Sequence, residues 1–198
     1  RLDGWPVAVL AGDPYHYGAG WTADASHKVT RFVDLAQTFH LPVVHFVDNP
    51  GFVIGVEAEK AATIRHGART LAAIYQATVP WCTIIVRKVF GVAGAGHANH
   101  ARLHYRYAWP SGDWGSLPVE GGIEAAYKAD LAEAEDPAAM LVEIEERLER
   151  YRSPFRTAEA FLIEEIIDPR DTRPLLCEFA NLAAPLRTTG ASAFHMRP

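Results

Sequence analysis

The segment from Pro42 to Gly55, PVVHFVDNPGFVIG, constrains the fold of this chain more than any other. It begins as an almost unbroken apolar run and ends in Asp48-Asn49-Pro50-Gly51, which predicts a buried strand that stops in a tight turn. Gly51 and Gly55 permit positive φ or the close approach of a ligand. A helical pattern follows, so we expect this loop at the carboxyl end of a strand, where α/β folds bind ligands. An ordinary strand-to-helix connection also explains these residues and stays open as the alternative.

A second segment of the same design runs from Cys82 to Gly96, CTIIVRKVFGVAGAG. Its β-branched residues at 83–86 predict a strand, and a loop of glycines and alanines follows. Such a loop exposes consecutive backbone N–H groups, which can stabilise an oxyanion without a charged side chain. It lacks the lysine of a P-loop and the glycine spacing of a dinucleotide site. Two strand–glycine-loop–helix units in succession, with RHGAR at 65–69 between them, are more specific than either alone.

Three segments together resemble the carboxyltransferase β subunits of acyl-CoA carboxylases of the propionyl-CoA and methylcrotonyl-CoA type: FVDNPGFVIG, IRHGARTLAAIYQATVP and RKVFGVAGAG. The resemblance extends from about Gly4 to about Leu182 and matches the C-terminal half of that subunit. It implies an α/β fold of the ClpP/crotonase class, a spiral of ββα units with a mostly parallel sheet and flanking helices. Periodicity alone predicts only a mostly parallel α/β fold. We therefore expect a C-terminal, crotonase-like carboxyltransferase domain over residues 1–183 and a tail over residues 184–198.

The composition of the chain argues against two classes of partner, nucleic acid and the membrane interior. The net charge of −5 and the pI near 6.0 argue against nucleic acid, which favours a basic surface. No apolar run approaches the ~20 residues that a membrane-spanning helix needs. Cys82 and Cys177 lack a metal-type spacing, and we expect both to be reduced packing residues of a cytoplasmic protein. A chain that starts at Arg1 rather than Met is expected to be a fragment or a processed chain.

The helical periodicity outside the two loops predicts several further elements. A helix capped by Asp24 is expected to run to about His40. A long helix is expected from Glu57 to Thr78, with one face buried: Ile64, Ala68, Leu71 and Tyr75. Further helices are expected over 119–134 and after the Asp136-Pro137 pair, and a short extended piece near Ile166 is expected to lead into a final helix.

Three histidines, His97, His100 and His104, would share one face if a helix followed Gly96. Such a face suits a transition metal. No carboxylate lies nearby in the sequence, however, and Arg102 and Arg106 would repel a cation. We therefore predict no metal site.

The chain contains no GxSxG elbow, no Cys–His arrangement and no paired carboxylates. The reaction implied by the resemblance needs none of these. In the family, carboxybiotin on a carrier domain releases carbon dioxide, the biotin ureido anion takes a proton from the α-carbon of an acyl-CoA, and the enolate attacks the carbon dioxide. Backbone N–H groups hold both anions. The resemblance therefore implies biotin as cofactor and acyl-CoA as substrate.

The family's functional positions fall on the two glycine loops. The oxyanion hole for the ureido group falls on the backbone of Val92 and Ala93, and the family usually has Gly at the position of Val92. Val resists positive φ, so this substitution predicts a reshaped hole. The remaining positions are those that contact biotin, namely Pro50, Gly51, Phe52, Gly55 and Gly91, and those that face the acyl substrate, namely Gly94 and Ala95.

The resemblance also implies partners. Active sites of the family form between the N-terminal half of one subunit and the C-terminal half of another, so we expect a homo-oligomer that is inactive without the N-terminal half. Biotin carboxyl carrier and biotin carboxylase components would complete the enzyme. Two alternatives stay open. One is a biotin-independent crotonase-like acyl-CoA decarboxylase. The other is a non-catalytic homologue kept for assembly, which Val92 and the unusual loop GVAGAGHANH suggest.

Overall fold

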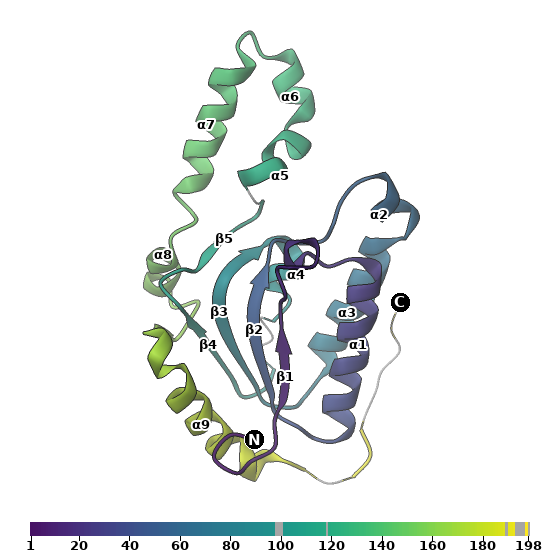
Figure 1. Ribbon diagram of the computed structural model, residues 1–198, viewed down its shortest axis with the longest axis vertical. Coiled ribbons are helices and arrows are strands. Elements are labelled where there is room, and N and C mark those ends of the chain that lie inside the picture. Colours follow the sequence, from purple (N-terminus) through teal and green to yellow (C-terminus); the bar gives the residue numbers. More distant parts are fainter. Residues whose placement is uncertain (98–100, 118, 189, 193–196, 198) are drawn as a thin grey trace.

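A parallel β-sheet forms the centre of the protein in a computed structural model that describes residues 1–97, 101–117, 119–188, 190–192 and 197, with 119–121 as backbone only (Figure 1). Within these residues the sheet has six strands: β1 Ala8–Ala11, β2 Val43–Asn49, β3 Trp81–Phe90, β4 His104–Ala108, β5 Asp113–Gly115 and β6 Glu165–Ile166. The order is β1-β2-β3-β4-β6, with β5 beside the end of β3, and each of these strand pairs is parallel. The mostly parallel sheet predicted from the sequence is confirmed.

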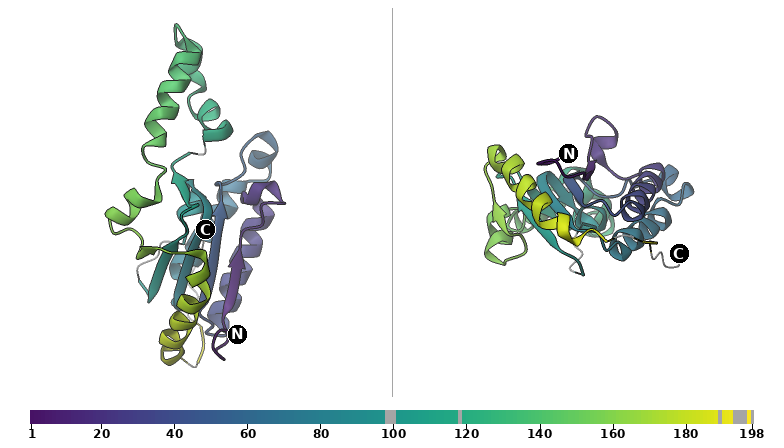
Figure 2. Two further views of the ribbon diagram at one scale, coloured as in Figure 1. Left: turned by 60° about the vertical axis from the view of Figure 1, so that its left-hand side comes forward. Right: turned by 90° about the horizontal axis from the view of Figure 1, so that it is seen from below.

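Helices cover both faces of this sheet. The α-helices are α1 Ala23–Thr38, α2 Val56–Lys60, α3 Thr63–Gln76, α4 Gly91–Ala95, α5 Val119–Ala126, α6 Lys128–Glu133, α7 Pro137–Glu149, α8 Pro154–Glu159 and α9 Thr172–Ala183. Short 3₁₀ turns lie at η1 Tyr17–Ala19, η2 Pro169–Asp171 and η3 Ala184–Leu186. Helices α1 and α3 lie against one face of the sheet and α9 against the other (Figures 1 and 2).

Residue alternation along the strands divides the core between these layers. Val43 and Trp81 pack with the α1–α3 layer, whereas their neighbours Val44 and Cys82 pack with α9. Both faces of β2 and β3 are therefore buried, which explains why these strands are nearly continuous apolar runs. As expected, Cys82 is a free cysteine in the core, and burial raises the pKa of its thiol to about 12.

Thr22 rather than Asp24 caps helix α1. The Ala25 amide donates to the Thr22 hydroxyl at 3.1 Å, and Asp24 lies in the first turn of the helix. The predicted cap was therefore two residues too late. An acidic side chain in the first turn still complements the helix dipole, so Asp24 stabilises the same helix end.

The long helix predicted from Glu57 to Thr78 is two helices, α2 and α3. Ala62 separates them with a left-handed φ of +54°. The predicted inward face of α3 was also wrong, because Ile64 is 55% exposed and Tyr75 is 50% exposed. The buried residues have the same spacing but another phase: Thr63, Gly67, Thr70 and Ile74.

Two tertiary contacts set this phase. The hydroxyl of Thr70 lies 3.0 Å from that of Thr30 on α1 and donates to the Ser26 carbonyl at 2.8 Å. A Cβ added to Gly67 would overlap the ring of Phe52, so only glycine lets this ring pack on α3. Gly67 was expected to mark close packing, and it does so against an aromatic ring.

Helices α5, α6 and α7 form an arm that extends away from the sheet (Figure 1). The predicted helix over 119–134 is interrupted at Tyr127, which separates α5 from α6. Asp136 caps α7 as predicted, accepting from the Ala138 and Ala139 amides at 3.1 Å each. Only Ile144 of α7 is fully buried, so most of this helix's surface is exposed.

The described residues of the C-terminal tail return to helix α1. Arg197 pairs with Asp34 at 2.8 Å, and the Ser192 hydroxyl donates to the Gln37 carbonyl at 2.9 Å. The division into a domain over 1–183 and a tail over 184–198 stays a prediction. Among the helices described here, none combines the length and apolar character that crossing a membrane requires.

The contact between Gly67 and Phe52 predicts a reversal of sign in a double-mutant cycle. Gly67→Ala is expected to destabilise the protein by about 1–3 kcal/mol, because the new methyl group displaces the Phe52 ring. In a Phe52→Ala background the same change should stabilise by about 1 kcal/mol, since only the better helix propensity of alanine is left. Urea unfolding of the four proteins measures this, and Ala68→Gly on the exposed face of α3 calibrates the propensity. Destabilisation of equal size in both backgrounds would contradict the assigned contact.

Candidate functional site

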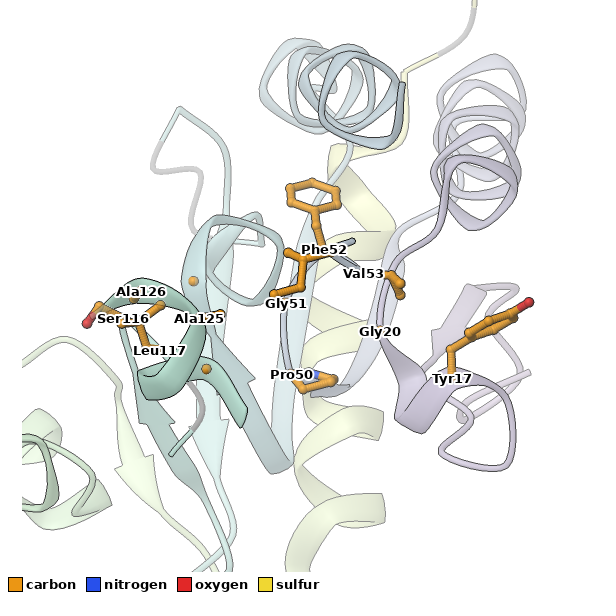
Figure 3. Close-up of a pocket in the computed structure, with 13 residues that line it drawn as sticks. Tyr17, Gly20, Pro50, Gly51, Phe52, Val53, Ser116, Leu117, Ala125 and Ala126 are labelled. Carbon is orange, nitrogen blue, oxygen red and sulfur yellow. The ribbon is translucent and has the colours of Figure 1, made fainter. Parts of the chain in front are cut away.

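A pocket of about 680 Å³ opens where the carboxyl ends of β2 and β3 meet α5 (Figure 3). It is lined by Tyr17, Gly20, Pro50, Gly51, Phe52, Val53, Ile54, Gly91, Ser116, Leu117, Gly122, Ala125 and Ala126. The lining thus includes four of the five residues predicted to bind a cofactor, namely Pro50, Gly51, Phe52 and Gly91. Gly55 lies outside it, where it begins α2 with a φ of +114°.

Two sets of hydrogen bonds hold the loop after β2, one from the Asn49 side chain and one from the backbone of Trp21. The Asn49 side chain accepts from the Gly51 amide at 2.8 Å, which closes a tight turn. The backbone of Trp21 then donates to the Gly51 carbonyl and accepts from the Val53 amide, each at 3.0 Å. Gly51 has a φ of +118°, so the expectation that this glycine serves a positive φ is met by its geometry.

The ring of Phe52 points away from the pocket. It packs on Gly67 of α3 and meets the Trp21 ring edge-on at a centroid distance of 6.0 Å. Figure 3 shows the ring directed toward the helices and away from Pro50. Phe52 therefore presents backbone and Cβ to the pocket and anchors the loop with its ring.

An irregularity in the sheet brings the second glycine loop beside the first. Val47 pairs with Ile85, but Asn49 pairs with Val89, so β3 has two more residues than β2 over this stretch. The buried carboxylate of Asp48 fills this bulge. It accepts from the Arg87 side chain at 3.1–3.2 Å and from the Lys88 amide at 3.2 Å. As a result, a Cβ on Gly51 would lie 3.6 Å from the Phe90 carbonyl oxygen.

Helix α4 begins directly at this junction. Phe90 caps it, and the positive φ of +59° falls on Gly91. Val92 is 64% exposed and Ala93 is buried, and neither has positive φ. The N–H groups of a helix's first turn have no acceptor within the helix, so those of Val92 and Ala93 make no hydrogen bond inside α4. Neither of these two predicted oxyanion-hole residues lines the pocket, whereas the preceding Gly91 does.

The two residues predicted to face an acyl substrate do not line the pocket. A Cβ on Gly94 would lie 2.8 Å from the Val89 carbonyl carbon and 3.3 Å from the Asn49 carbonyl oxygen, so this glycine lets α4 pack on β2 and β3. Ala95 is exposed at the last position of α4. Neither placement tests a role toward a substrate.

The pocket wall contains no Asp, Glu, His, Lys or Arg among the described residues that line it. Its hydrogen-bonding groups are therefore backbone amides and carbonyls with the hydroxyls of Tyr17 and Ser116. The sequence patterns indicated the two glycine loops but missed Ser116, Leu117 and α5. No local pattern marks these residues, because they reach the pocket only through the pairing of β5 with β3.

The histidines of the rejected metal site do not share a helix. His97 lies in the turn after α4, His104 lies on β4, and His100 is outside the described residues. Among the described residues, no group of three or more His, Cys, Asp or Glu side chains is arranged to hold a metal ion.

A second hollow of about 430 Å³ lies beside the first and shares Tyr17 and Gly20 with it. Unlike the first, it is lined by ionisable side chains from β2 and α1, among them His45, Asp48 and Lys28. His45 is deeply buried, and this burial lowers its pKa to about 3. His45 is therefore neutral at physiological pH.

Comparisons with protein families and with known proteins agree on one family. The carboxyl transferase domain family matches residues 1–195. The propionyl-CoA carboxylase carboxyltransferase subunit of Haloferax mediterranei is 37% identical over 175 residues, which cover 87% of this chain and 34% of the relative. The methylmalonyl-CoA decarboxylase subunit alpha of Veillonella parvula is 31% identical over 196 residues, which cover 98% of this chain and 37% of the relative.

A solved structure matches the whole chain. The crystal structure of transcarboxylase 12S, a hexamer assembly with methylmalonyl-coenzyme A and methylmalonic acid bound, superposes with a TM-score of 0.81 at 33% identity. The match covers 100% of this chain and 38% of that chain. The predicted crotonase-like α/β class and the predicted family are confirmed. This chain spans about a third of the length of the relatives that it matches.

The lowered pKa of His45 predicts a pH dependence of stability. The unfolded chain takes up a proton at this histidine near pH 6.5, whereas the folded protein resists it until about pH 3. The free energy of unfolding should therefore fall as the pH drops from about 6.5 toward 3, by about 1.4 kcal/mol per pH unit for this one group.

Urea unfolding between pH 4 and 7 measures this slope. His45→Gln, which cannot take up the proton, should reduce the slope by about one proton's contribution. His16→Gln is the matched control, because His16 is exposed. An unchanged slope in His45→Gln would show that His45 does not carry the effect.

Proposed function

This chain belongs to the carboxyl transferase domain family, and we propose that it forms the C-terminal half of a carboxyltransferase that moves a carboxyl group from carboxybiotin to the α-carbon of an acyl-CoA. The pocket between Gly51 and Gly91 is the observation that carries this proposal. It has apolar walls, no charged side chain among the described residues that line it, and the first turn of α4 at its edge. A site of this kind stabilises a developing negative charge through backbone amides.

Biotin fits these walls by its chemistry. Its bicyclic ring is largely apolar and carries one ureido oxygen, and the pocket combines apolar side chains with backbone amides. When bound, carboxybiotin supplies the carboxyl group. Pro50, Val53 and Leu117 would contact the ring and exclude water from it, which strengthens any hydrogen bond made inside.

The amides of Val92 and Ala93 would donate to the ureido oxygen as it gains negative charge. Loss of one oxyanion-hole donor typically costs about 2.7–4 kcal/mol of transition-state stabilisation. The valine at position 92 leaves this donor in place, since the positive φ of the turn falls on Gly91. In this proposal the enzyme holds charge and supplies no base of its own.

We further propose that this chain needs the remainder of a carboxyltransferase to be active. A hole for the substrate thioester is expected on the N-terminal half, and Ala95 at the exposed end of α4 would reach an acyl group only across an interface with that half. Biotin carboxyl carrier and biotin carboxylase components would act as partners. The relative with bound methylmalonyl-coenzyme A is a hexamer, which supports a homo-oligomer here.

A second candidate is an acyl-CoA decarboxylase of the same fold. The similarity to the methylmalonyl-CoA decarboxylase subunit alpha of Veillonella parvula supports it. A third candidate is an assembly homologue without activity, for which Val92 and the loop GVAGAGHANH are the two arguments. The ordinary φ of Val92 removes the first of them.

The first experiment is the intact mass of the natural polypeptide together with a biotin blot of the proteins that co-purify with it. A subunit of roughly two domains' length bound to a biotinylated partner supports carboxyl transfer. An active decarboxylation assay in the absence of any biotinylated partner would favour the second candidate instead.

Gly51→Val tests the pocket within the natural enzyme. The β-branched side chain is strained at a φ of +118°, and its Cβ would approach the Phe90 carbonyl at the pocket wall. We expect carboxyl transfer to be lost while the folded structure persists by circular dichroism. Gly4→Val is the matched control, because Gly4 has a φ of +85° but a Cβ there would have no heavy atom within 4 Å, and Gly4 does not line the pocket. Unchanged turnover in Gly51→Val would remove this loop from the site.

A further inference from the structure

A group of polar side chains, buried except for the half-buried Arg106, lies between the sheet and the C-terminal end of α3, away from the pocket. Each member has a buried nitrogen or oxygen without a hydrogen-bond partner. The members are His45, Trp81, Thr83, His97, Arg102 and Arg106, and we call them the interior polar cluster. Native proteins leave few such atoms unsatisfied, so six neighbouring residues with unpaired atoms require an explanation.

Strand register and ring contacts make this cluster contiguous. His45 on β2, Thr83 on β3 and Arg106 on β4 are direct register partners, so their side chains form one row on one face of the sheet. The His45 ring lies 5.9 Å from the Trp81 ring and 6.3 Å from the His97 ring, between centroids. The guanidinium carbon of Arg102 lies 4.5 Å from the centroid of the Trp81 ring.

Arg102 is the cationic centre of the cluster. Its Nη1 donates to the carbonyls of Ile74 and Ala77 at 2.7 and 2.8 Å, where it caps the C-terminal end of α3. Its Nε and Nη2 are buried and unpaired. These two nitrogens form one edge of the planar guanidinium, and their parallel N–H groups match the two oxygens of a carboxylate.

Arg102 has no carboxylate partner among the described residues. Burial lowers the pKa of Arg102 to about 10, so this side chain keeps its positive charge at neutral pH. The pKa of His97 is also lowered, first by burial and then by His45, Arg106 and Arg102, so this histidine is neutral. Glu164 accepts from the Arg106 backbone amide but is itself exposed, and none of the described carboxylates pairs with Arg102.

We propose that the interior polar cluster binds a small planar oxyanion of the carboxylate or bicarbonate class, held by the Nε and Nη2 edge of Arg102. Four of the unpaired atoms only donate: Arg102 Nε and Nη2, Arg106 Nε and Trp81 Nε1. The neutral histidines and the Thr83 hydroxyl can donate as well. A cation would be repelled by two guanidinium groups, and water alone would satisfy donors without neutralising the buried charge.

Thermal unfolding of the full-length protein in its natural assembly tests this site. Sodium formate and sodium bicarbonate should each raise Tm saturably, by roughly 5 °C at a hundredfold excess over Kd, beyond the effect of sodium chloride at the same ionic strength. Arg102→Lys keeps the charge and a donor for the α3 carbonyls but lacks the two-nitrogen edge, and it should weaken formate binding at least tenfold. Arg170→Lys, on an exposed arginine, is the matched control and should bind formate as the wild type does.

A crystal structure of the wild-type assembly grown in formate keeps the proposal testable if Arg102→Lys does not fold. Planar density within hydrogen-bond distance of Arg102 Nε and Nη2 would support the site. A side-chain carboxylate from another part of the assembly in that position would overturn a site for a free anion. Equal Tm shifts with formate and chloride, in the wild type and in Arg102→Lys alike, would also overturn it.

Discussion

The ion pair of Asp48 with Arg87, together with the Lys88 amide, determines the geometry of the ligand end of the sheet. Without it, the two additional residues of β3 would leave backbone polar groups unsatisfied beside β2. The carboxylate is buried, and its side chain is only 11% exposed, whereas the Arg87 side chain is 47% exposed. Its partners therefore include one solvated cation and one fixed amide, and the amide contact is what holds the bulge in register. Because β3 is displaced there, Phe90 and Gly91 lie beside Gly51 and the two glycine loops form one pocket.

The pocket depends on backbone conformation more than on side-chain identity. Positive φ is required at Gly51 and Gly91, and each residue lies where a strand ends and a turn begins. The positions next to these two glycines do not require glycine. Val92 has an ordinary φ, and the Phe52 ring packs elsewhere, so side chains can vary around the pocket while the amides stay in place. A site built in this way can stabilise negative charge by geometry, which agrees with the carboxyl transfer proposed for this chain.

Residue type alone predicted the strands β2 and β3, which are apolar runs, and the turn at Gly51. Residue type did not predict which face of α3 is buried. Its apolar stripe is exposed, and small or polar residues are buried because Thr70 bonds to α1 and Gly67 accommodates Phe52, contacts that join residues distant in sequence. The far wall of the pocket was missed for the same reason, since Ser116 and α5 reach it through a strand pairing that no periodicity reveals. The biotin and substrate roles of the glycine loops came from the family resemblance and stay proposals.

Strands β2 and β3 contribute to two chemically different layers. At their carboxyl ends they shape the largely apolar pocket, and further along the sheet they form, together with β4, the polar row of His45, Thr83 and Arg106. This row lies between apolar rows, with Val43 and Trp81 on one side and Val47 and Ile85 on the other. The three side chains of this row lie side by side, but within the described part of the chain His45 Nδ1, Thr83 Oγ1 and Arg106 Nε have no hydrogen-bond partner. The His97 ring, which follows α4 in the chain, lies 6.3 Å from the His45 ring on this face. His97 thus connects the end of α4 with the interior polar cluster, and the anion proposed for this cluster would bind close to that end of the helix.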